Sequence, residues 1–563
     1  MQAVYNIAEI CARHGITDVV LSPGSRSAPL TLAFARHPEL TVRVVPDERA
    51  AAFIGLGIAQ AQRRAVALVC TSGTAGLNYA PAVAEAFFQQ IPLVIFTADR
   101  PPEWIDQLDG QTIRQHNLYG AHAKGAFEFP VETSHPDAKW YSARIINEAI
   151  NLAQAAPAGP VQVNVPLREP LYPNAGEEIR YDEDVKIIRE YSDPLFVKKG
   201  NSNLLAEINS ANRILVVAGQ RPLDESLAAV PVFAAKSNAT VVADVISNVN
   251  IPAITNQDIF LAGLSETKQQ ELQPDLLITF GQSLISKSLK LFLRKLKPAR
   301  HWHIQAQGQA PDTFRTLTEI IRMEPHDFFQ YVAGCDQKLV NTQLLNWKEA
   351  SSKASEFLTK FAVAEGSRFN EFVVFRRITV ELQRNTALHL ANSMAVRYAN
   401  ILGIPQGKQI EVFANRGTSG IDGCTSTAVG AALATPQRPV VLLTGDVAFF
   451  YDRNAFWHNY STPNLRVVLF NNHGGGIFRI IDGPRQQPEL EEFFETRQTL
   501  TAENTAKDFN LRYFPVSSFE ELEAALPVFF AAETGAAILE VFTDSKTNAA
   551  FFEQYRSAVK AAF

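Results

Sequence analysis

Short apolar runs alternate with alanine-rich amphipathic stretches along most of the chain. Each run is too short for a buried helix and is followed by turn-forming residues, which predicts a buried strand. Strands that alternate with helices are typical of parallel sheets with helices on both faces. The expected strands are residues 18–21, 41–45, 65–70, 92–97, 213–218, 239–245, 275–280, 301–305, 410–414, 439–444, 465–470 and 537–543.

Two stretches break this alternation and suggest where domains end. A proline-rich passage at 156–173 runs into a charged stretch at 177–199, which we interpret as the end of a first domain and a linker. A polar, helical segment at 342–365 closes the second group of strands. The 563 residues therefore predict an α/β protein of three doubly wound domains with mainly parallel sheets. The expected domains are residues 1–175, 195–345 and 365–563.

Composition and charge exclude several classes of function. The 52 basic and 58 acidic residues give a net charge of −6, which provides no field for a phosphate backbone, so nucleic acid is not an expected partner. No run of 18 uncharged apolar residues and no basic leader occurs, and we expect a cytoplasmic protein without a transmembrane segment. The cysteines lack metal-ligand spacing and are interpreted as plain buried thiols of a reducing compartment. They are Cys11, Cys70, Cys335 and Cys424.

One pair of strand ends carries the chemistry of a metal site. Gly445-Asp446-Val447 directly follows the strand 439–444, and Asn472 comes 26 residues after Asp446 in a stretch that continues His473-Gly474-Gly475-Gly476. A carboxylate, an amide oxygen and glycines that let backbone carbonyls approach would form an all-oxygen site for Mg2+, completed by the phosphates of a ligand. Each half alone is more simply a capping aspartate or a glycine turn, but the pair at these strand ends favours the metal site.

This pair resembles the signature of the thiamine diphosphate (ThDP) family of decarboxylases and carboligases, although Val447 stands where many members have glycine. The resemblance implies that Asp446, Asn472 and the Gly474 carbonyl hold Mg2+, with Mn2+ as an alternative, on the cofactor diphosphate. It also assigns Glu48, between the strand 41–45 and a helix, as the catalytic carboxylate that promotes the reactive tautomer of the cofactor. Without the first motif, Glu48 would be interpreted as an ordinary acid at a helix N-terminus.

Further cofactor-binding residues follow from the same resemblance. Thr71 and Ser72, directly after a strand, resemble the small-residue loop near the cofactor pyrimidine. Ile421, two residues after Ser419, matches the bulky apolar residue that props the cofactor in its bent conformation, and Ile477 would also pack against the cofactor. Plain core packing is the alternative for both isoleucines.

Longer strings resemble one branch of this family, whose members are transferases of menaquinone biosynthesis. That branch decarboxylates 2-oxoglutarate and adds the succinyl unit to isochorismate. Both substrates carry two carboxylates, so an acidic chain needs local arginines, whose bonds to carboxylates contribute roughly 1.5 to 3 kcal/mol each. The strings cover the first and last domains, and the middle domain matches only around 281–287. They are residues 22–30, 97–103, 113–115, 415–423 and 471–478.

The resemblance implies two substrate-binding sets. Ser393 and Arg397 are four residues apart, which places them on one face of a helix, and Ser288 replaces an arginine that the family often has after Lys287. The donor set would hold the succinyl unit through Asn392, Ser393, Arg397, Arg416 and Phe478. The isochorismate set comprises Ser25, Arg26, Arg100, Lys287 and Gln111, the last also expected to orient the acceptor or a water as a catalytic residue.

The family builds each active site between the first domain of one subunit and the last domain of another. The resemblance therefore implies a homo-oligomer, either a dimer or a dimer of dimers. One alternative function is another ThDP-dependent carboligase or 2-oxo acid decarboxylase, such as an acetolactate synthase-like enzyme. A second is a catalytically inactive subunit with the same fold. A dinucleotide-binding enzyme is disfavoured because no G-x-G-x-x-G follows an early strand.

Overall fold

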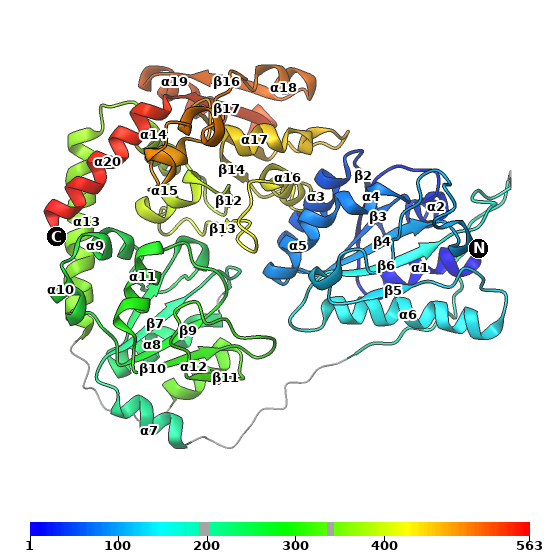
Figure 1. Cartoon of the computed structure of the whole chain (residues 1–563), viewed down its shortest axis with the longest axis horizontal. Helices are drawn as coiled ribbons and strands as arrows, with labels where there is room; N and C mark the ends of the chain where they lie inside the picture. The colour runs from blue at the N-terminus through cyan, green and yellow to red at the C-terminus, as the bar shows by residue number, and fades with distance from the viewer. Residues whose placement is uncertain (175, 191–201, 225, 335–342) are drawn as a thin grey trace.

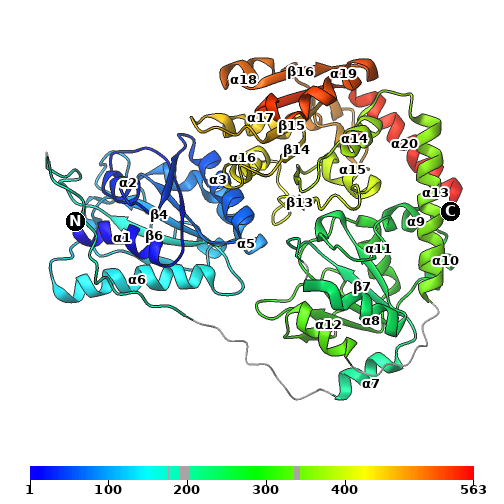
Figure 2. The ribbon, with the colours of Figure 1, turned by 180° about the vertical axis from the view of Figure 1, so that it is seen from behind.

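The computed structural model describes residues 1–174, 176–190, 202–224, 226–334 and 343–563 (Figure 1). Three sheets, in which every strand pair is parallel, each lie between helices in a domain of their own. The three-domain α/β fold predicted from the sequence is thus confirmed, whereas the domain bounds stay predictions. Figures 1 and 2 show the first domain beside the last, with the middle domain below the last.

The first domain is built on the strand order β2-β1-β3-β4-β6-β5. Its four central strands are buried on both faces because helices cover both sides of the sheet. The strands are β1 (Asp18–Leu21), β2 (Thr41–Val44), β3 (Val66–Cys70), β4 (Leu93–Asp99), β5 (Ala126–Glu128) and β6 (Val161–Pro166). The helices are α1 (Gln2–Arg13), α2 (Ala28–Ala35), α3 (Glu48–Gln62), α4 (Thr74–Asn78), α5 (Ala80–Gln89) and α6 (Pro136–Gln154).

The middle domain has the strand order β11-β10-β9-β7-β8. Its strands are β7 (Ile214–Ala218), β8 (Thr240–Ala243), β9 (Leu276–Phe280), β10 (Arg300–Ile304) and β11 (Glu319–Ile321). Its helices are α7 (Ser202–Ser210), α8 (Ala229–Ser237), α9 (Gln257–Gly263), α10 (Glu266–Glu271), α11 (Lys287–Leu296) and α12 (Pro325–Ala333). The long helix α13 (Gln343–Glu365) then runs up to the last domain, beside the C-terminal helix (Figure 2).

The last domain repeats the topology of the first, with the order β13-β12-β14-β15-β17-β16. Strand by strand this matches the first sheet, so corresponding loops emerge at corresponding strand ends. Its strands are β12 (Ala387–Leu390), β13 (Glu411–Phe413), β14 (Val440–Gly445), β15 (Leu465–Asn471), β16 (Arg512–Val516) and β17 (Ala537–Phe542). Its helices are α14 (Glu371–Val380), α15 (Met394–Leu402), α16 (Cys424–Ala434), α17 (Asp446–Tyr451), α18 (Glu503–Asp508), α19 (Phe519–Phe529) and α20 (Ser545–Ala562).

All twelve expected strands form, with their ends within two residues of the prediction. The passage 156–199, interpreted as the end of the first domain and a linker, differs from that interpretation in its linker part, and it also contains a strand that was not predicted. The proline-rich passage contains β6, a buried strand between β4 and β5. Residues 177–190 then pack back onto the first domain, where Asn6 donates to Asp182 and Asn147 to the Lys186 carbonyl. Residues 191–199 of the expected linker lie outside the described residues.

The first and last domains meet along α3 and α16, two small-residue helices. A side chain at Gly57 would place its Cβ 2.1 Å from the Thr427 carbonyl oxygen, so only glycine permits this approach. Every residue of α3 from Ala50 to Ala59 is buried, which explains why this helix lacks a polar face. Cys70 on the adjoining β3 is buried and unpaired, as are Cys11 and Cys424, in agreement with plain thiols, while Cys335 lies outside the described residues.

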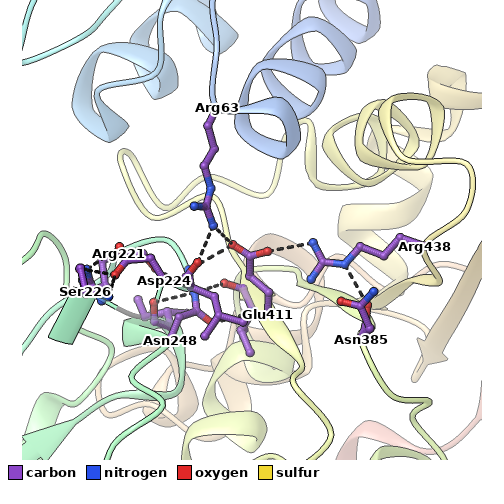
Figure 3. Close-up of polar contacts among 11 residues, drawn as sticks. Arg63, Arg221, Asp224, Ser226, Asn248, Asn385, Glu411 and Arg438 are labelled. Atoms are coloured by element: carbon purple, nitrogen blue, oxygen red, sulfur yellow. Dashed lines mark hydrogen bonds and ion pairs between the residues drawn. The ribbon is translucent and has the colours of Figure 1, made fainter. Parts of the chain in front are cut away.

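All three domains meet at the buried carboxylate of Glu411, the first residue of β13 (Figure 3). It accepts hydrogen bonds from the Leu223 amide of the middle domain (3.1 Å), from Arg63 at the end of α3 (3.2 Å) and from Arg438 (2.8 Å). Asn248 of the middle domain also bonds both the amide and the carbonyl of Val412. These contacts fix β13 of the last domain, and hence the loop that follows it, relative to the first and middle domains.

We expect Glu411→Ala to lower the free energy of unfolding by about 3 kcal/mol, because it removes a buried carboxylate that the Leu223 amide, Arg63 and Arg438 share as an acceptor. Urea unfolding followed by circular dichroism would measure the change. Glu523→Ala removes an exposed partner of Arg377 and serves as the control, with an expected loss of under about 1 kcal/mol. Equal losses for the two variants would contradict a special role of the Glu411 junction.

Within the described part of the chain, no helix combines the length and the apolar character needed to cross a membrane.

Candidate active site

Apart from Lys287, the predicted site residues follow the carboxyl ends of strands in the first and last sheets, where ligands bind in open α/β sheets. In the last domain, Asp446 begins α17 directly after β14 and is only 2% exposed. Its carboxylate accepts hydrogen bonds from the Gly474 amide (2.7 Å) and from Gln498 (2.9 Å). Asp446 and Gly474, 28 positions apart in the chain, are therefore brought together as the sequence motif predicts.

Asn472 lies next to this pair, and its amide is oriented by a residue that the motif analysis did not identify. The Asn472 Nδ2 group donates to the buried Glu371 carboxylate (2.6 Å), while its Oδ1 atom is buried and has no hydrogen-bond partner in the described residues. Burial, helped by nearby Asp446, raises the pKa of Glu371 to about 7. Glu371 opens α14, far from any motif, so only the fold could reveal it.

These donors fit a divalent cation held partly by a ligand. Burial raises the pKa of Asp446 to about 6, Asn472 offers an unused amide oxygen, and the Gly474 carbonyl, bonded to the Gly476 amide at 2.9 Å, keeps a second lone pair. The described residues contain no group of three or more His, Cys, Asp or Glu side chains arranged to hold a metal. A site with one carboxylate suits Mg2+, which is typically bound by one or two carboxylates plus phosphates.

Two arginines of the predicted donor set lie near each other at the neighbouring strand ends. Arg416 donates to the Asn392 side-chain oxygen (2.8 Å), and Asn392 in turn donates to the carbonyls of Asn415 and Gly420. Burial and the positive charge of Arg416 both lower the pKa of Arg397. The two guanidinium groups thus share one region, which a carboxylate would neutralise.

The prediction that Ser393 shares a helix face with Arg397 was wrong. Helix α15 begins at Met394, and Ser393 precedes it as the N-cap with φ of 76°. Its backbone carbonyl nevertheless accepts a hydrogen bond from Arg397. Ser393 and Arg397 are therefore in contact, but through the Ser393 backbone rather than through two side chains on one helix face.

The apolar residues predicted beside the cofactor line the same region. Ile421 packs against Ala391, Cys424 and Ala448, so the alternative of core packing holds for part of its surface. Ile477 and Phe478 are half-buried in the short turn after Gly475. Ser419 is exposed, with φ of 64°.

In the first domain, Glu48 is the first residue of α3 and is half-buried. It accepts a long hydrogen bond from Asn78 (3.4 Å), and no hydrogen bond or ion pair found for it in the described residues reaches the last domain. Its neighbours do reach that domain, since Asp47 accepts from Asn454 and Arg49 donates to the Tyr451 carbonyl (both 2.8 Å). Among the described residues, Glu48 and Asp446 therefore have no hydrogen-bond partner in common.

Thr71 and Ser72 follow β3 and lie near the loop that holds Gln111. Both hydroxyl groups are buried without a hydrogen-bond partner among the described residues, which suits a polar ligand. Gln115, which sequence reasoning had not singled out as a site residue, ties this region to the sheet by accepting from the Gly73 amide (2.7 Å) and donating to the Ala98 carbonyl (3.0 Å). Gln111 itself is exposed, and its backbone lies against Gly73.

Ser25, Arg26 and Arg100 complete the first-domain group. A side chain at Gly24 would overlap Thr71, so the loop after β1 lies directly on the loop after β3. Burial, followed by the positive charge of Arg100, lowers the pKa of Arg26, which places these guanidinium groups near each other. Ser25 is exposed at the same loop.

The middle domain supplies a second lysine that sequence reasoning missed. Lys287 starts α11 and is exposed. One turn later, Lys290 is half-buried and donates to the Leu284 carbonyl (2.7 Å). Burial and then the charge of Arg416 lower the pKa of Lys290, so this lysine faces the donor region. The sequence of α11 does not show which of the two lysines points toward the last domain, because that depends on how the middle domain docks.

Three family descriptions match the chain. Residues 1–120 match "Thiamine pyrophosphate enzyme, N-terminal TPP binding domain", residues 204–390 "Middle domain of thiamine pyrophosphate", and residues 402–541 "Thiamine pyrophosphate enzyme, C-terminal TPP binding domain".

Relatives from several bacteria match over nearly the whole length. Proteins named 2-succinyl-5-enolpyruvyl-6-hydroxy-3-cyclohexene-1-carboxylate synthase are similar to this chain in Cytophaga hutchinsonii (45% identity, 100% of both chains) and in Flavobacterium johnsoniae (39% identity, 98% of this chain and 97% of the relative). A crystal structure of benzoylformate decarboxylase from Polynucleobacter necessarius shares the fold, with a TM-score of 0.70 and 17% identity over 97% of this chain and 99% of the other.

Proposed function

Because the chain belongs to the thiamine pyrophosphate enzymes, and within them to the 2-succinyl-5-enolpyruvyl-6-hydroxy-3-cyclohexene-1-carboxylate synthases, we propose that it catalyses the reaction for which those relatives are named. The proposed donor is 2-oxoglutarate, which loses CO2, and the proposed acceptor is isochorismate, which receives the succinyl unit. ThDP and Mg2+, or Mn2+ in its place, are the proposed cofactors.

The observation that carries the choice of donor is the pair of neighbouring arginines beside the Asp446 and Asn472 strand ends. Burial and the positive charge of Arg416 lower the pKa of Arg397, and burial lowers the pKa of Arg416, which an anionic ligand would relieve. A donor with a second carboxylate, such as 2-oxoglutarate, would satisfy them. Pyruvate has no second carboxylate for this purpose.

Residues of the first and last domains would bind different parts of the cofactor. Asp446, Asn472 and the Gly474 carbonyl would hold the metal and diphosphate, while Ile421 and Ile477 would fix the cofactor's apolar part and Glu48 would hold a proton at its pyrimidine. When bound, ThDP supplies the carbanion-stabilising chemistry that no protein side chain offers.

Acceptor binding falls to the first-domain cluster in this proposal. Arg26 and Arg100 would bind the carboxylates of isochorismate, with Ser25, Gln111 and Lys287 at its edge. Arg100 donates to the Gly110 carbonyl (2.8 and 3.0 Å) and pairs with Asp109 (2.6 Å), so the loop that holds Gln111 is fixed by the same arginine. We further propose a cytoplasmic homodimer or homotetramer, because the family that this chain belongs to builds each active site between the first domain of one subunit and the last domain of another.

Isochorismate-dependent release of CO2 from 2-oxoglutarate, with ThDP and Mg2+ present, tests the proposed function. Mass spectrometry should find one product that carries the succinyl unit on the acceptor. Pyruvate in place of 2-oxoglutarate is the matched control and should give little turnover. Preference for pyruvate, or decarboxylation without an adduct, would contradict the proposal and favour another ThDP-dependent carboligase or decarboxylase.

A further inference from the structure

We propose that Glu85, on helix α5 of the first domain, is a positioning residue for the loop at 415–423 of the last domain, which carries Arg416, Ser419 and Ile421. Its effect on the donor rests on the proposed function, whereas its effect on the loop does not. No motif points to Glu85, which lies in an alanine-rich helix that reads as ordinary core.

The Glu85 carboxylate receives three hydrogen bonds from two consecutive loop residues. One oxygen accepts from the Gly417 amide (2.8 Å), and the other accepts from the Thr418 amide (2.7 Å) and the Thr418 hydroxyl (2.5 Å). Gln89, one turn further along α5, also donates to it (2.5 Å). Glu85 is only 1% exposed, and a buried carboxylate is tolerated when several donors satisfy it in this way.

We call the hydrogen bonds from Gly417 and Thr418 to Glu85 the clamp. Other contacts hold the loop on either side of it. Gln220 and Ser283 of the middle domain donate to the carbonyls of Ala414 (2.9 Å) and Arg416 (2.8 Å). Asn392 of the last domain binds the Gly420 carbonyl (2.6 Å). Glu85 therefore anchors the centre of a loop whose ends are fixed by the other two domains.

The clamp would act on the donor through Arg416. The Arg416 guanidinium bonds Asn392, while its backbone continues directly into the two amides that Glu85 holds. If these amides are released, the guanidinium loses its fixed position relative to Arg397, although both arginines remain in the chain. Donor binding should then weaken, while the first-domain residues assigned to the acceptor stay in place.

Glu85→Gln is the direct test, because glutamine keeps the shape but must turn its NH2 group toward one of the two loop amides. Hydrogen–deuterium exchange of the cofactor-free protein should become at least about tenfold faster in peptides covering 415–421, because one amide loses a charge-assisted bond. Peptides from β14 should be unchanged. In the loaded enzyme, KM for 2-oxoglutarate should rise about tenfold, with kcat and KM for isochorismate nearly unchanged.

Three further variants keep the test independent of folding defects. Thr418→Val removes one donor from the loop side and should reproduce part of the effect, whereas Thr418→Ser keeps the hydroxyl and should behave as wild type. Glu148→Gln removes an exposed carboxylate of α6, which pairs with Arg144 one turn away, and should change neither measurement.

The outcomes separate this inference from the proposed function. Unchanged exchange at 415–421 in Glu85→Gln would overturn the clamp, and faster exchange with an unchanged KM for 2-oxoglutarate would overturn its role in donor binding. A wild-type enzyme that does not use 2-oxoglutarate would overturn the proposed function. In that case the exchange rates alone decide whether Glu85 holds the loop.

Discussion

Glu48→Gln is expected to lower turnover by about 10²- to 10⁴-fold, the range typical of removing a positioned proton-transfer group. Glutamine has nearly the same shape and can still form a hydrogen bond at the first position of α3. It cannot ionise, however, and so cannot hold a shared proton at the cofactor pyrimidine. Binding of ThDP should persist, because the residues proposed to hold its diphosphate lie in the last domain.

Two measurements separate these effects. Exchange of the cofactor C2 proton, followed by NMR after rapid quenching, should slow in Glu48→Gln, while ThDP titration should give an affinity within a few-fold of wild type. Asn78→Ala, which removes only the partner that donates to Glu48, is the matched control and should slow exchange much less. An unchanged exchange rate in Glu48→Gln would refute the proton-transfer role.

The sequence predicted the interior of the fold better than its edges. Buried strands such as β3 and β14 are continuous apolar runs, and hydrophobic pattern identifies such runs directly. Two interior strands were missed. In β6, Gln162 and Asn164 break the apolar run, although both are buried and bonded to neighbouring polar side chains, and the four-residue β12 is interrupted by the buried His389. The edge strands β5, β11 and β16 are short or partly exposed and lack a pattern that could be read from sequence.

The sequence also predicted only part of the candidate site. Asp446, Asn472 and Gly474 follow strand ends within one motif, so sequence spacing was enough to pair them. Glu371 and Glu85 reach the site from other helices, and in the case of Glu85 from another domain. Their contacts depend on how helices and domains dock, which no local pattern encodes.

Chains of two inactive variants, Glu48→Gln and Asp446→Ala, are expected to regain activity when they exchange. Asp446→Ala removes the only carboxylate proposed for the metal site and should abolish binding of Mg2+ and ThDP. If each active site joins the first domain of one chain to the last domain of its partner, every mixed dimer has one intact site and one doubly defective site. Random pairing makes half of the dimers mixed, so about one quarter of wild-type activity should return.

CO2 release from 2-oxoglutarate plus isochorismate, measured after mass spectrometry has verified exchange, would quantify the recovery. Mixing Asp446→Ala with Asn472→Ala is the control, because both defects lie in the last domain and no pairing yields an intact site. Sites contained within single chains would give no recovery in either mixture, since each chain would keep its own defect. Recovery in the first mixture alone therefore requires a site shared between subunits, and its absence after verified exchange would place Glu48 and Asp446 of one chain at the same site.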